Sequence, residues 1–136
     1  MKSIKIMVGQ IPAISKLVGD EAELLLDDTA SILDAIDELD KMIAKNGGFP
    51  LREYGSLLHM VYNPLENRFY KQVAVIGYGQ SGGMLNVRKN LNEELPDGSK
   101  VILVPQGVCI TEWENPVEYE VFLKARSSSV GYCQSS

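Results

Sequence analysis

The chain has 136 residues and a mass of 15.0 kDa, which suits one compact domain or one domain with an appendage. A hydrophobic fraction of 45% and a charged fraction of 23% exclude wholesale disorder. The longest unbroken apolar runs have four residues, against the roughly twenty that a membrane helix needs, so no membrane span is expected. The net charge of −5 and the lack of a basic stripe argue against nucleic acid as a partner.

Cysteine and histidine usage further limits the protein class. Two cysteines, Cys109 and Cys133, are fewer than the disulfide framework of a small secreted domain requires. The N-terminal apolar stretch of residues 6–8 is too short for the core of a signal peptide. We therefore expect a cytoplasmic protein. The single histidine, His59, lies far along the chain from both cysteines, so no metal site is predicted, and no motif indicates a cofactor.

The first quarter of the chain predicts an antiparallel hairpin of two half-buried strands. Residues 3–8 and residues 21–27 both alternate between apolar and polar side chains, as a strand with one buried face does. The loop between them is marked by Pro12 and Gly19. The alternation places these residues on the buried face: Ile4, Ile6, Val8, Ala22, Leu24 and Leu26.

One long helix is predicted next. Asp27-Asp28-Thr29 is typical of a helix start, with Thr29 as the cap and two acids at the positive end of the helix dipole. Asn46-Gly47-Gly48 ends the helix, and Pro50 follows. Apolar residues fall at helical spacing between these signals: Ile32, Ile36, Leu39 and Ile43.

Residues 51–72 are ambiguous. We favour a strand over residues 57–62, with a short helix over residues 51–59 as the alternative. Residues 63–67 (NPLEN) predict a turn, and residues 68–76 a returning strand.

Residues 77–105 predict loops around one strong strand. The glycine-rich run of residues 77–83 (GYGQSGG) predicts a loop, residues 84–88 a short edge strand and residues 91–95 a helical turn. Pro96-Asp97-Gly98 predicts a tight turn. Residues 100–105 then predict a central strand with both faces covered, because the run from Val101 to Val104 is continuously apolar.

The last part of the chain predicts a second hairpin and a tail. Residues 108–113 and 117–123 both tolerate a strand, with Asn115-Pro116 between them. We expect this hairpin to pack on the main sheet or to extend it. Residues 127–136 are rich in serine and predict a flexible tail.

The order of these elements is that of a β-grasp (ubiquitin-like) domain: an α+β fold with a mixed sheet packed on one long helix, here with a C-terminal β-hairpin extension. Residues 90–105 (NLNEELPDGSKVILVP) resemble the last third of the MoaD/ThiS sulfur-carrier family, in which a helical turn, a tight turn and an apolar strand lead into a proline and a glycine tail. The resemblance covers residues 1–107, which leaves residues 108–126 as the extension and residues 127–136 as the tail.

The resemblance implies a specific chemistry that this chain only partly matches. A sulfur carrier ends in Gly-Gly, and a partner enzyme adenylates its free carboxylate before conversion to a thiocarboxylate. At the equivalent point the chain has one glycine, Gly107, and 29 residues follow it. Because a folded extension is a poor protease site, we favour a non-catalytic protein-binding module, the small accessory subunit of a larger enzyme complex.

Two alternatives remain open. The first is a genuine carrier for molybdopterin, thiamin or related biosynthesis, processed so that Gly107 carries the thiocarboxylate, with an adenylating activating enzyme as its partner. The second is a phage-type tail-assembly protein, because a β-grasp family of that kind uses a similar LPDG turn, here residues 95–98.

The candidate site residues each have a structural alternative. Trp113, Tyr119 and Phe122 are aromatic side chains that could anchor a protein interface or close the core beneath the extension. Cys109 is a candidate reactive thiol, but its nearest charged neighbours in sequence are Glu112 and Glu114 rather than a cation, which favours an inert role.

Three further features favour structural or solvated roles. The glycine-rich run lacks the Lys-Ser/Thr pair of a phosphate-binding loop. His59 has no partner at the spacing of a catalytic triad. Acidic pairs such as Glu93-Glu94 are most simply solvated. We therefore expect no enzymatic activity.

Overall fold

The computed structural model describes residues 1–51, 53–106 and 110–126. Residues 119–126 are helical, and Ile110–Glu112 forms a 3-10 turn. The remaining elements, in chain order, are β1 (Lys2–Met7), α1 (Pro12–Val18), β2 (Glu21–Leu26), α2 (Ile32–Lys45), α3 (Leu57–Val61), β3 (Tyr62–Asn63), β4 (Arg68–Phe69), β5 (Val73–Tyr78), β6 (Met84–Leu85) and β7 (Lys100–Pro105).

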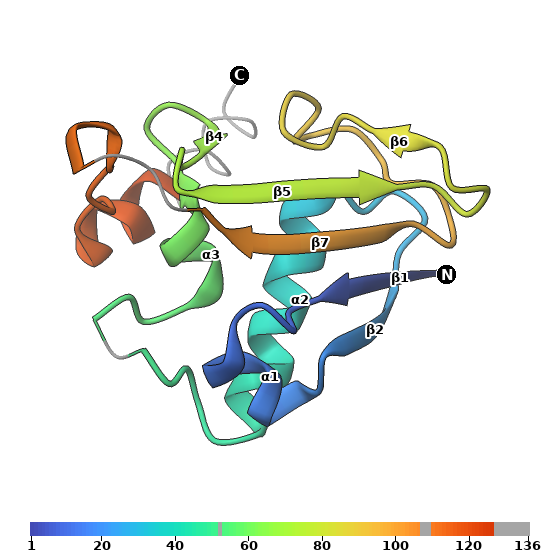
Figure 1. Cartoon of the computed structure of the whole chain (residues 1–136), viewed down its shortest axis with the longest axis horizontal. Helices are drawn as coiled ribbons and strands as arrows, with labels where there is room; N and C mark the ends of the chain where they lie inside the picture. Colours follow the sequence, from blue (N-terminus) through green and yellow to red (C-terminus); the bar gives the residue numbers. More distant parts are fainter. Residues whose placement is uncertain (52, 107–109, 127–136) are drawn as a thin grey trace.

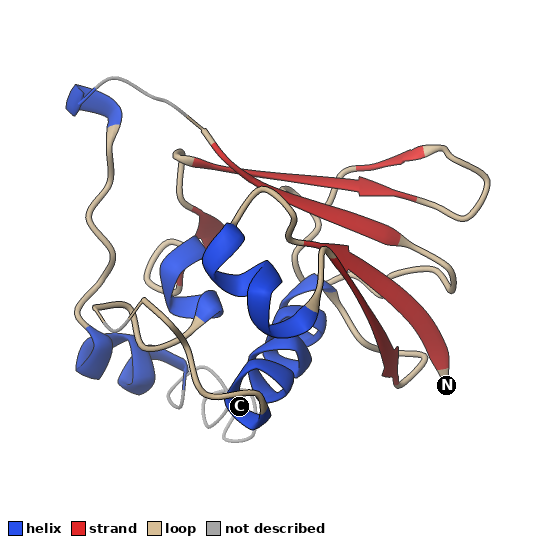
Figure 2. Cartoon of the chain, turned by 60° about the horizontal axis from the view of Figure 1, so that its bottom comes forward, coloured by secondary structure: helices blue, strands red, loops and turns tan. Residues whose placement is uncertain are grey.

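The main sheet has five strands in the order β2-β1-β7-β5-β6. β1 and β7 are parallel, and the other neighbouring pairs are antiparallel. α2 crosses behind the sheet (Figure 1), and the helices gather on one face of it (Figure 2). An opening hairpin, a helix and a central strand parallel to β1 define a β-grasp topology. The predicted α+β class and the mixed sheet on a long helix are confirmed.

The opening hairpin and the central strand form as predicted. β1 pairs with β2 in a register that sets Ile4 opposite Leu24, and all six residues expected on the buried face are buried. β7 lies at the centre of the sheet. Its burial alternates, however, with Val101 and Leu103 buried but Ile102 and Val104 only partly so. The expectation that both faces are covered is wrong, because the helices lie on one side of the sheet.

The long helix starts later than predicted. α2 is capped by Ser31 rather than Thr29, in a capping box: the Ser31 side chain accepts the backbone N–H of Asp34, and the Asp34 carboxylate accepts the backbone N–H of Ser31 at 2.9 Å. Five side chains on one face of α2 form the centre of the core against the sheet: Ile32, Ala35, Ile36, Leu39 and Ile43.

Two short helices replace predicted loop or strand. α1 forms where a loop was expected, because Pro12 occupies the first helical turn, the one helical place that suits proline. α3 replaces the favoured strand over residues 57–62, with Ser56 as its cap. The predicted returning strand is split into β4 and the longer β5. Residues 91–95 form turns rather than a helix.

The predicted C-terminal hairpin is absent from the described residues 110–126, which contain the 3-10 turn, an extended stretch and the helix of residues 119–126. Its residues alternate as in a strand, but Tyr119, Phe122 and Leu123 also have the i, i+3, i+4 spacing of a helix face. Phe122 is buried while Tyr119 and Leu123 stay partly exposed, so it is the burial of Phe122 in the core that favours the helix. The predicted tail, residues 127–136, lies outside the described residues.

Candidate functional site

The residues after β7 fold back onto the domain. We call residues 110–126 the C-terminal segment; it lies beside α3 and the β3–β4 hairpin (Figure 1). Glu114 fixes its start: the carboxylate accepts hydrogen bonds from the Arg68 guanidinium and, at 2.8 Å, from the backbone N–H of Lys71. The Arg68 hydrogen bonds lower the pKa of Glu114 from 4.5 to about 2. This anchor is therefore intact above about pH 4.5 and is lost as the pH falls toward 2.

Backbone groups of the C-terminal segment are also satisfied by the domain. Gln72, a buried side chain, donates to the carbonyl of Glu114 at 2.6 Å and accepts the Glu114 N–H at 3.2 Å. The Tyr70 hydroxyl accepts the N–H of Val117 at 2.8 Å. These bonds pair polar groups that would otherwise compete for water, so the segment is held in one extended path.

His59 is the inner anchor of the C-terminal segment. It is 3% exposed, and its two ring nitrogens contact the carbonyl oxygens of Tyr54 and Val117. The rings of Tyr119 and Phe122 pack against it edge-on, with centroids 5.1 and 4.9 Å away. Because both nitrogens face backbone carbonyls, His59 has no nucleophile to activate. Its structural role agrees with the interpretation from sequence.

The three aromatic candidates of the C-terminal segment differ in how exposed their side chains are. Phe122 is 3% exposed and belongs to the core, whereas Trp113 is 50% exposed and Tyr119 is 42% exposed. The Tyr119 ring covers Gly55, whose φ of +82° and lack of a side chain allow that approach.

The remaining sequence candidates do not converge on this site. Gly107 and Cys109 lie outside the described residues, as does Cys133. The glycine-rich run links β5 to β6 at the far side of the sheet from α3 (Figure 1). Gly77 is needed there for packing, since a Cβ at this position would lie 2.8 Å from Cγ1 of Val87.

Asp40 links α2 to α3 beneath the C-terminal segment. Its carboxylate accepts the backbone N–H of Leu57 at 2.7 Å and that of Leu58 at 3.0 Å. Burial raises the pKa of Asp40 from 3.8 to about 6 and outweighs these two bonds, which lower it. Because the pKa of Asp40 is higher in the folded chain than in the unfolded chain, the protonated carboxyl stabilises the fold. This stabilisation is fully present below about pH 3.8 and is lost as the pH rises through 6.

The Asp40→Asn variant is expected to remove this pH dependence. Between pH 4 and pH 7, the wild-type chain should lose on the order of 2 kcal/mol of stability relative to the variant, because only the wild type buries a new charge. Urea unfolding of both proteins at several pH values measures the difference. Glu93→Gln, at an exposed carboxyl, is the control and should parallel the wild type. Parallel curves for the wild type and Asp40→Asn would contradict the assignment.

Sequence reasoning missed Lys2, a buried charge at the other end of the domain. It is 3% exposed, and its ammonium donates to the carbonyls of Asp28, Ala30 and Leu95 at 2.8, 2.8 and 2.6 Å. The signal was present, because Lys2 is in phase with Ile4 and Ile6 on the buried face of β1. A lysine at a core position indicates a structural charge with built-in acceptors.

The described part of the chain holds neither a metal cluster nor a membrane span. No group of three or more His, Cys, Asp or Glu that could hold a metal ion occurs among the described residues. Within residues 1–51, 53–106 and 110–126, no helix is long and apolar enough to cross a membrane.

Comparison with known proteins gives structural neighbours only. No family model matches the chain, and no curated protein matches it. Small archaeal modifier protein 1 from Haloferax volcanii aligns at 17% identity and a TM-score of 0.49, over 79% of this chain and 100% of that one. A putative molybdopterin converting factor subunit 1 from Pyrococcus furiosus aligns at 23% identity and a TM-score of 0.46, over 79% and 100%. These likenesses are too weak to carry function, and the fold assignment rests on the strand order described above.

Proposed function

We propose that the protein is a non-catalytic protein-binding module, the small accessory subunit of a larger enzyme complex. The observation that supports this proposal is the docked C-terminal segment. Phe122 is buried in the core, and Glu114 is bonded to Arg68 on β4. Carrier chemistry requires a tail that ends at Gly107, so a segment held in this way would have to leave its contacts with the domain before it could be removed.

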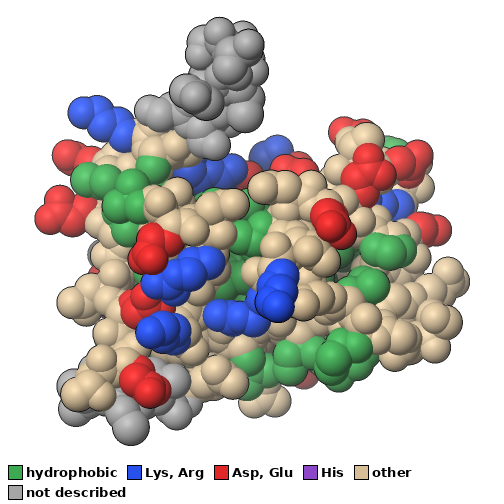
Figure 3. Space-filling view, turned by 90° about the horizontal axis from the view of Figure 1, so that it is seen from above, with side chains coloured by type: hydrophobic (Ala, Val, Ile, Leu, Met, Phe, Trp, Pro, Cys, Tyr) green, Lys and Arg blue, Asp and Glu red, His purple; other side chains and the backbone are tan. Residues whose placement is uncertain are grey.

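The same segment supplies a surface for a partner. It carries four large hydrophobic side chains that are at least 40% exposed, and aromatic residues contribute most to interface affinity. They are Trp113, Tyr119, Val121 and Leu123. Seen from above β5, Lys and Arg side chains gather over the middle of the molecule, with acidic and hydrophobic groups beside them (Figure 3).

The Trp113→Ala variant tests the proposal. Tagged full-length protein, purified from its native host, should retain a partner in constant stoichiometry, and the variant should lose about 2 kcal/mol of affinity, roughly thirtyfold. Leu65→Ala is the matched control, because Leu65 is also a large exposed side chain but lies in the turn between β3 and β4. Both variants should keep the wild-type melting temperature. Equal retention of the partner by both variants would contradict the proposed surface.

The carrier function remains a second candidate, and one feature favours it. β7 leads directly to Pro105 and Gln106, which are both exposed, so the last described residues before Gly107 lie at the surface. Processing at Gly107 would create a new C-terminus one residue beyond Gln106. It would also release the C-terminal segment, with the loss of the anchors on His59 and Arg68. The two candidates therefore differ in the mass of the mature protein.

A further inference from the structure

β2 is the long free edge of the main sheet. It has six residues, whereas β6 at the opposite edge has two. Among the described residues, no strand pairs with the outer side of β2. Unpaired backbone groups along such an edge are a template for an additional strand, and proteins that do not use the edge normally protect it.

The phase of the β1–β2 ladder shows which groups are free. Val8 donates its backbone N–H to the carbonyl of Asp20 at 2.8 Å, and the register continues in steps of one residue along the strands. Hydrogen-bonded and non-bonded pairs alternate in an antiparallel ladder. Even-numbered residues of β2 therefore bond to β1. The N–H and C=O groups of Glu21, Glu23 and Leu25 point outward.

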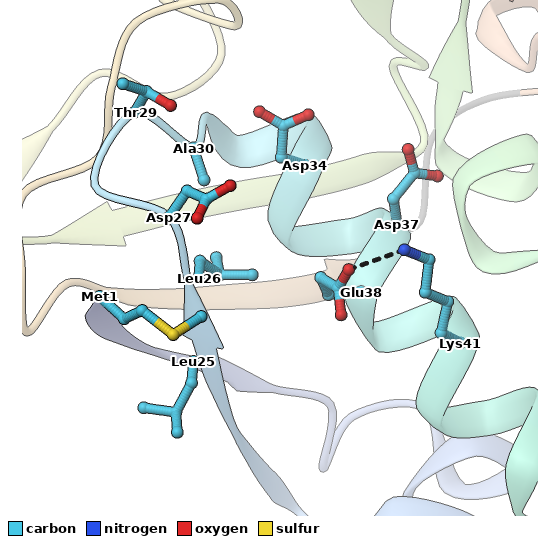
Figure 4. Close-up of a pocket in the computed structure, with 10 residues that line it drawn as sticks. All are labelled: Met1, Leu25, Leu26, Asp27, Thr29, Ala30, Asp34, Asp37, Glu38 and Lys41. Atoms are coloured by element: carbon cyan, nitrogen blue, oxygen red, sulfur yellow. Dashed lines mark hydrogen bonds and ion pairs between the residues drawn. The ribbon is translucent and has the colours of Figure 1, made fainter.

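A groove of about 410 Å³ runs between this edge and α2. Figure 4 shows Leu25, Leu26 and Met1 on one side and the side chains of α2 on the other. Leu25 is 66% exposed, so the edge offers an apolar contact as well as backbone groups. A strand added to β2 would place alternate side chains toward α2 and the rest beside Leu25.

The groove is acidic. Four carboxylates and one lysine line it: Asp27, Asp34, Asp37, Glu38 and Lys41. Lys41 is paired with Glu38 at 2.8 Å, and Arg126 pairs with Asp37. Asp27 and Asp34 have no ion-pair partner among the described residues. The side chains of Glu21 and Glu23 lie on the open face of β2, away from α2, so the acidic character of the groove comes from the residues before and on α2.

The walls of the groove are held in place. Lys2 fixes the loop before α2 through the carbonyls of Asp28 and Ala30, and the capping box with Ser31 fixes the carboxylate of Asp34. A groove whose walls are already ordered requires less ordering of the protein when a ligand binds.

We propose that this edge binds an extended basic segment of a partner protein, which adds to β2 as a further strand. Backbone hydrogen bonds to Glu21, Glu23 and Leu25 supply affinity. Lys or Arg side chains on the helix side meet the carboxylates of α2, and an apolar residue meets Leu25. This inference rests on the proposed function and specifies the partner class of the binding module, a protein with an extended basic segment. It is separate from Trp113, so Trp113→Ala should leave it unchanged.

The test uses the full-length, ¹⁵N-labelled protein and a ten-residue peptide of alternating Lys and Val, with a Glu-Val peptide as the charge control. The Lys-Val peptide should shift amide resonances of residues 21–26 and the first turns of α2. Glu23→Pro removes one outward N–H and no ladder bond, as an edge strand tolerates. It should bind about tenfold more weakly than Glu23→Gln, which loses the same charge but keeps the N–H.

Glu38→Lys is the second variant, and it leaves the backbone of β2 unaltered. It should also weaken binding about tenfold, and it decides the question if Glu23→Pro does not fold. Equal binding of the Lys-Val and Glu-Val peptides, or binding of every variant as tight as wild type, would overturn the proposal. Failure of the peptide to bind would do so too, as would pairing of β2 with a second copy of the chain. The two proposals can fail independently. If Trp113→Ala loses the native partner but still binds the peptide, the β2 edge is a site distinct from the Trp113 surface.

Discussion

Replacement of Lys2 with methionine is expected to lower the free energy of unfolding by about 3 kcal/mol. Methionine has a similar length but cannot donate, so the carbonyls that Lys2 serves in the loop before α2 and at Leu95 lose a charge-assisted bond inside the fold. The loss should also loosen the junction between β1, the start of α2 and residue 95. Urea unfolding with a spectroscopic probe measures the change.

Lys5→Met is the matched control for this prediction. Lys5 is on the same strand but on the open face, where its side chain is 44% exposed and pairs with Glu21 at 3.3 Å. An exposed ion pair contributes little to stability, so this variant should lose less than about 1 kcal/mol. Equal effects of the two substitutions would show that the bonds of Lys2 do not hold the core.

Replacement of Phe122 with alanine is expected to release the C-terminal segment, at a cost of about 3 kcal/mol. The ring is buried against His59, so its removal leaves a cavity beneath the helix of residues 119–126. The bonds on Glu114 hold only the start of the segment, so the helix of residues 119–126 is the part that the variant frees. Limited proteolysis should therefore cut the variant within residues 110–126, at protease concentrations that leave the wild type intact.

Val121→Ala is the control on the same helix, because Val121 is exposed. Its free energy of unfolding should stay within about 0.5 kcal/mol of the wild-type value. Its resistance to the protease should match that of wild type. If Phe122→Ala were as resistant as this control, the C-terminal segment would not depend on core packing, and the main support for an unprocessed module would be removed.

The elements that the sequence predicted well are those with a strong local pattern. The hairpin of β1 and β2 and the face of α2 follow from periodicity alone, since each element buries a continuous face against the same core. Residues 57–61 lack such a signal, because a short apolar run fits strand or helix equally. Asp40 decides in favour of the helix through its bonds to Leu57 and Leu58, from a position that the local sequence does not reveal.

The candidate site was less predictable for a related reason. The aromatic residues were identified, but their separation into buried Phe122 and exposed Trp113 depends on the path of the C-terminal segment. That path is set by Arg68 and Glu114, which are 46 residues apart. The helix of residues 119–126 is mistaken for a strand from sequence, because Tyr119, Val121 and Leu123 occupy alternate positions. The i, i+3, i+4 spacing of a helix face is present in the same residues but is no stronger a signal.

The intact mass of the protein purified from its native host tests the central claim most directly. A species at the full 15.0 kDa, purified together with a larger partner, is the result that we predict for an unprocessed binding module. A shorter species that ends at Gly107, heavier than its free acid by the exchange of oxygen for sulfur, would contradict the account and identify a sulfur carrier.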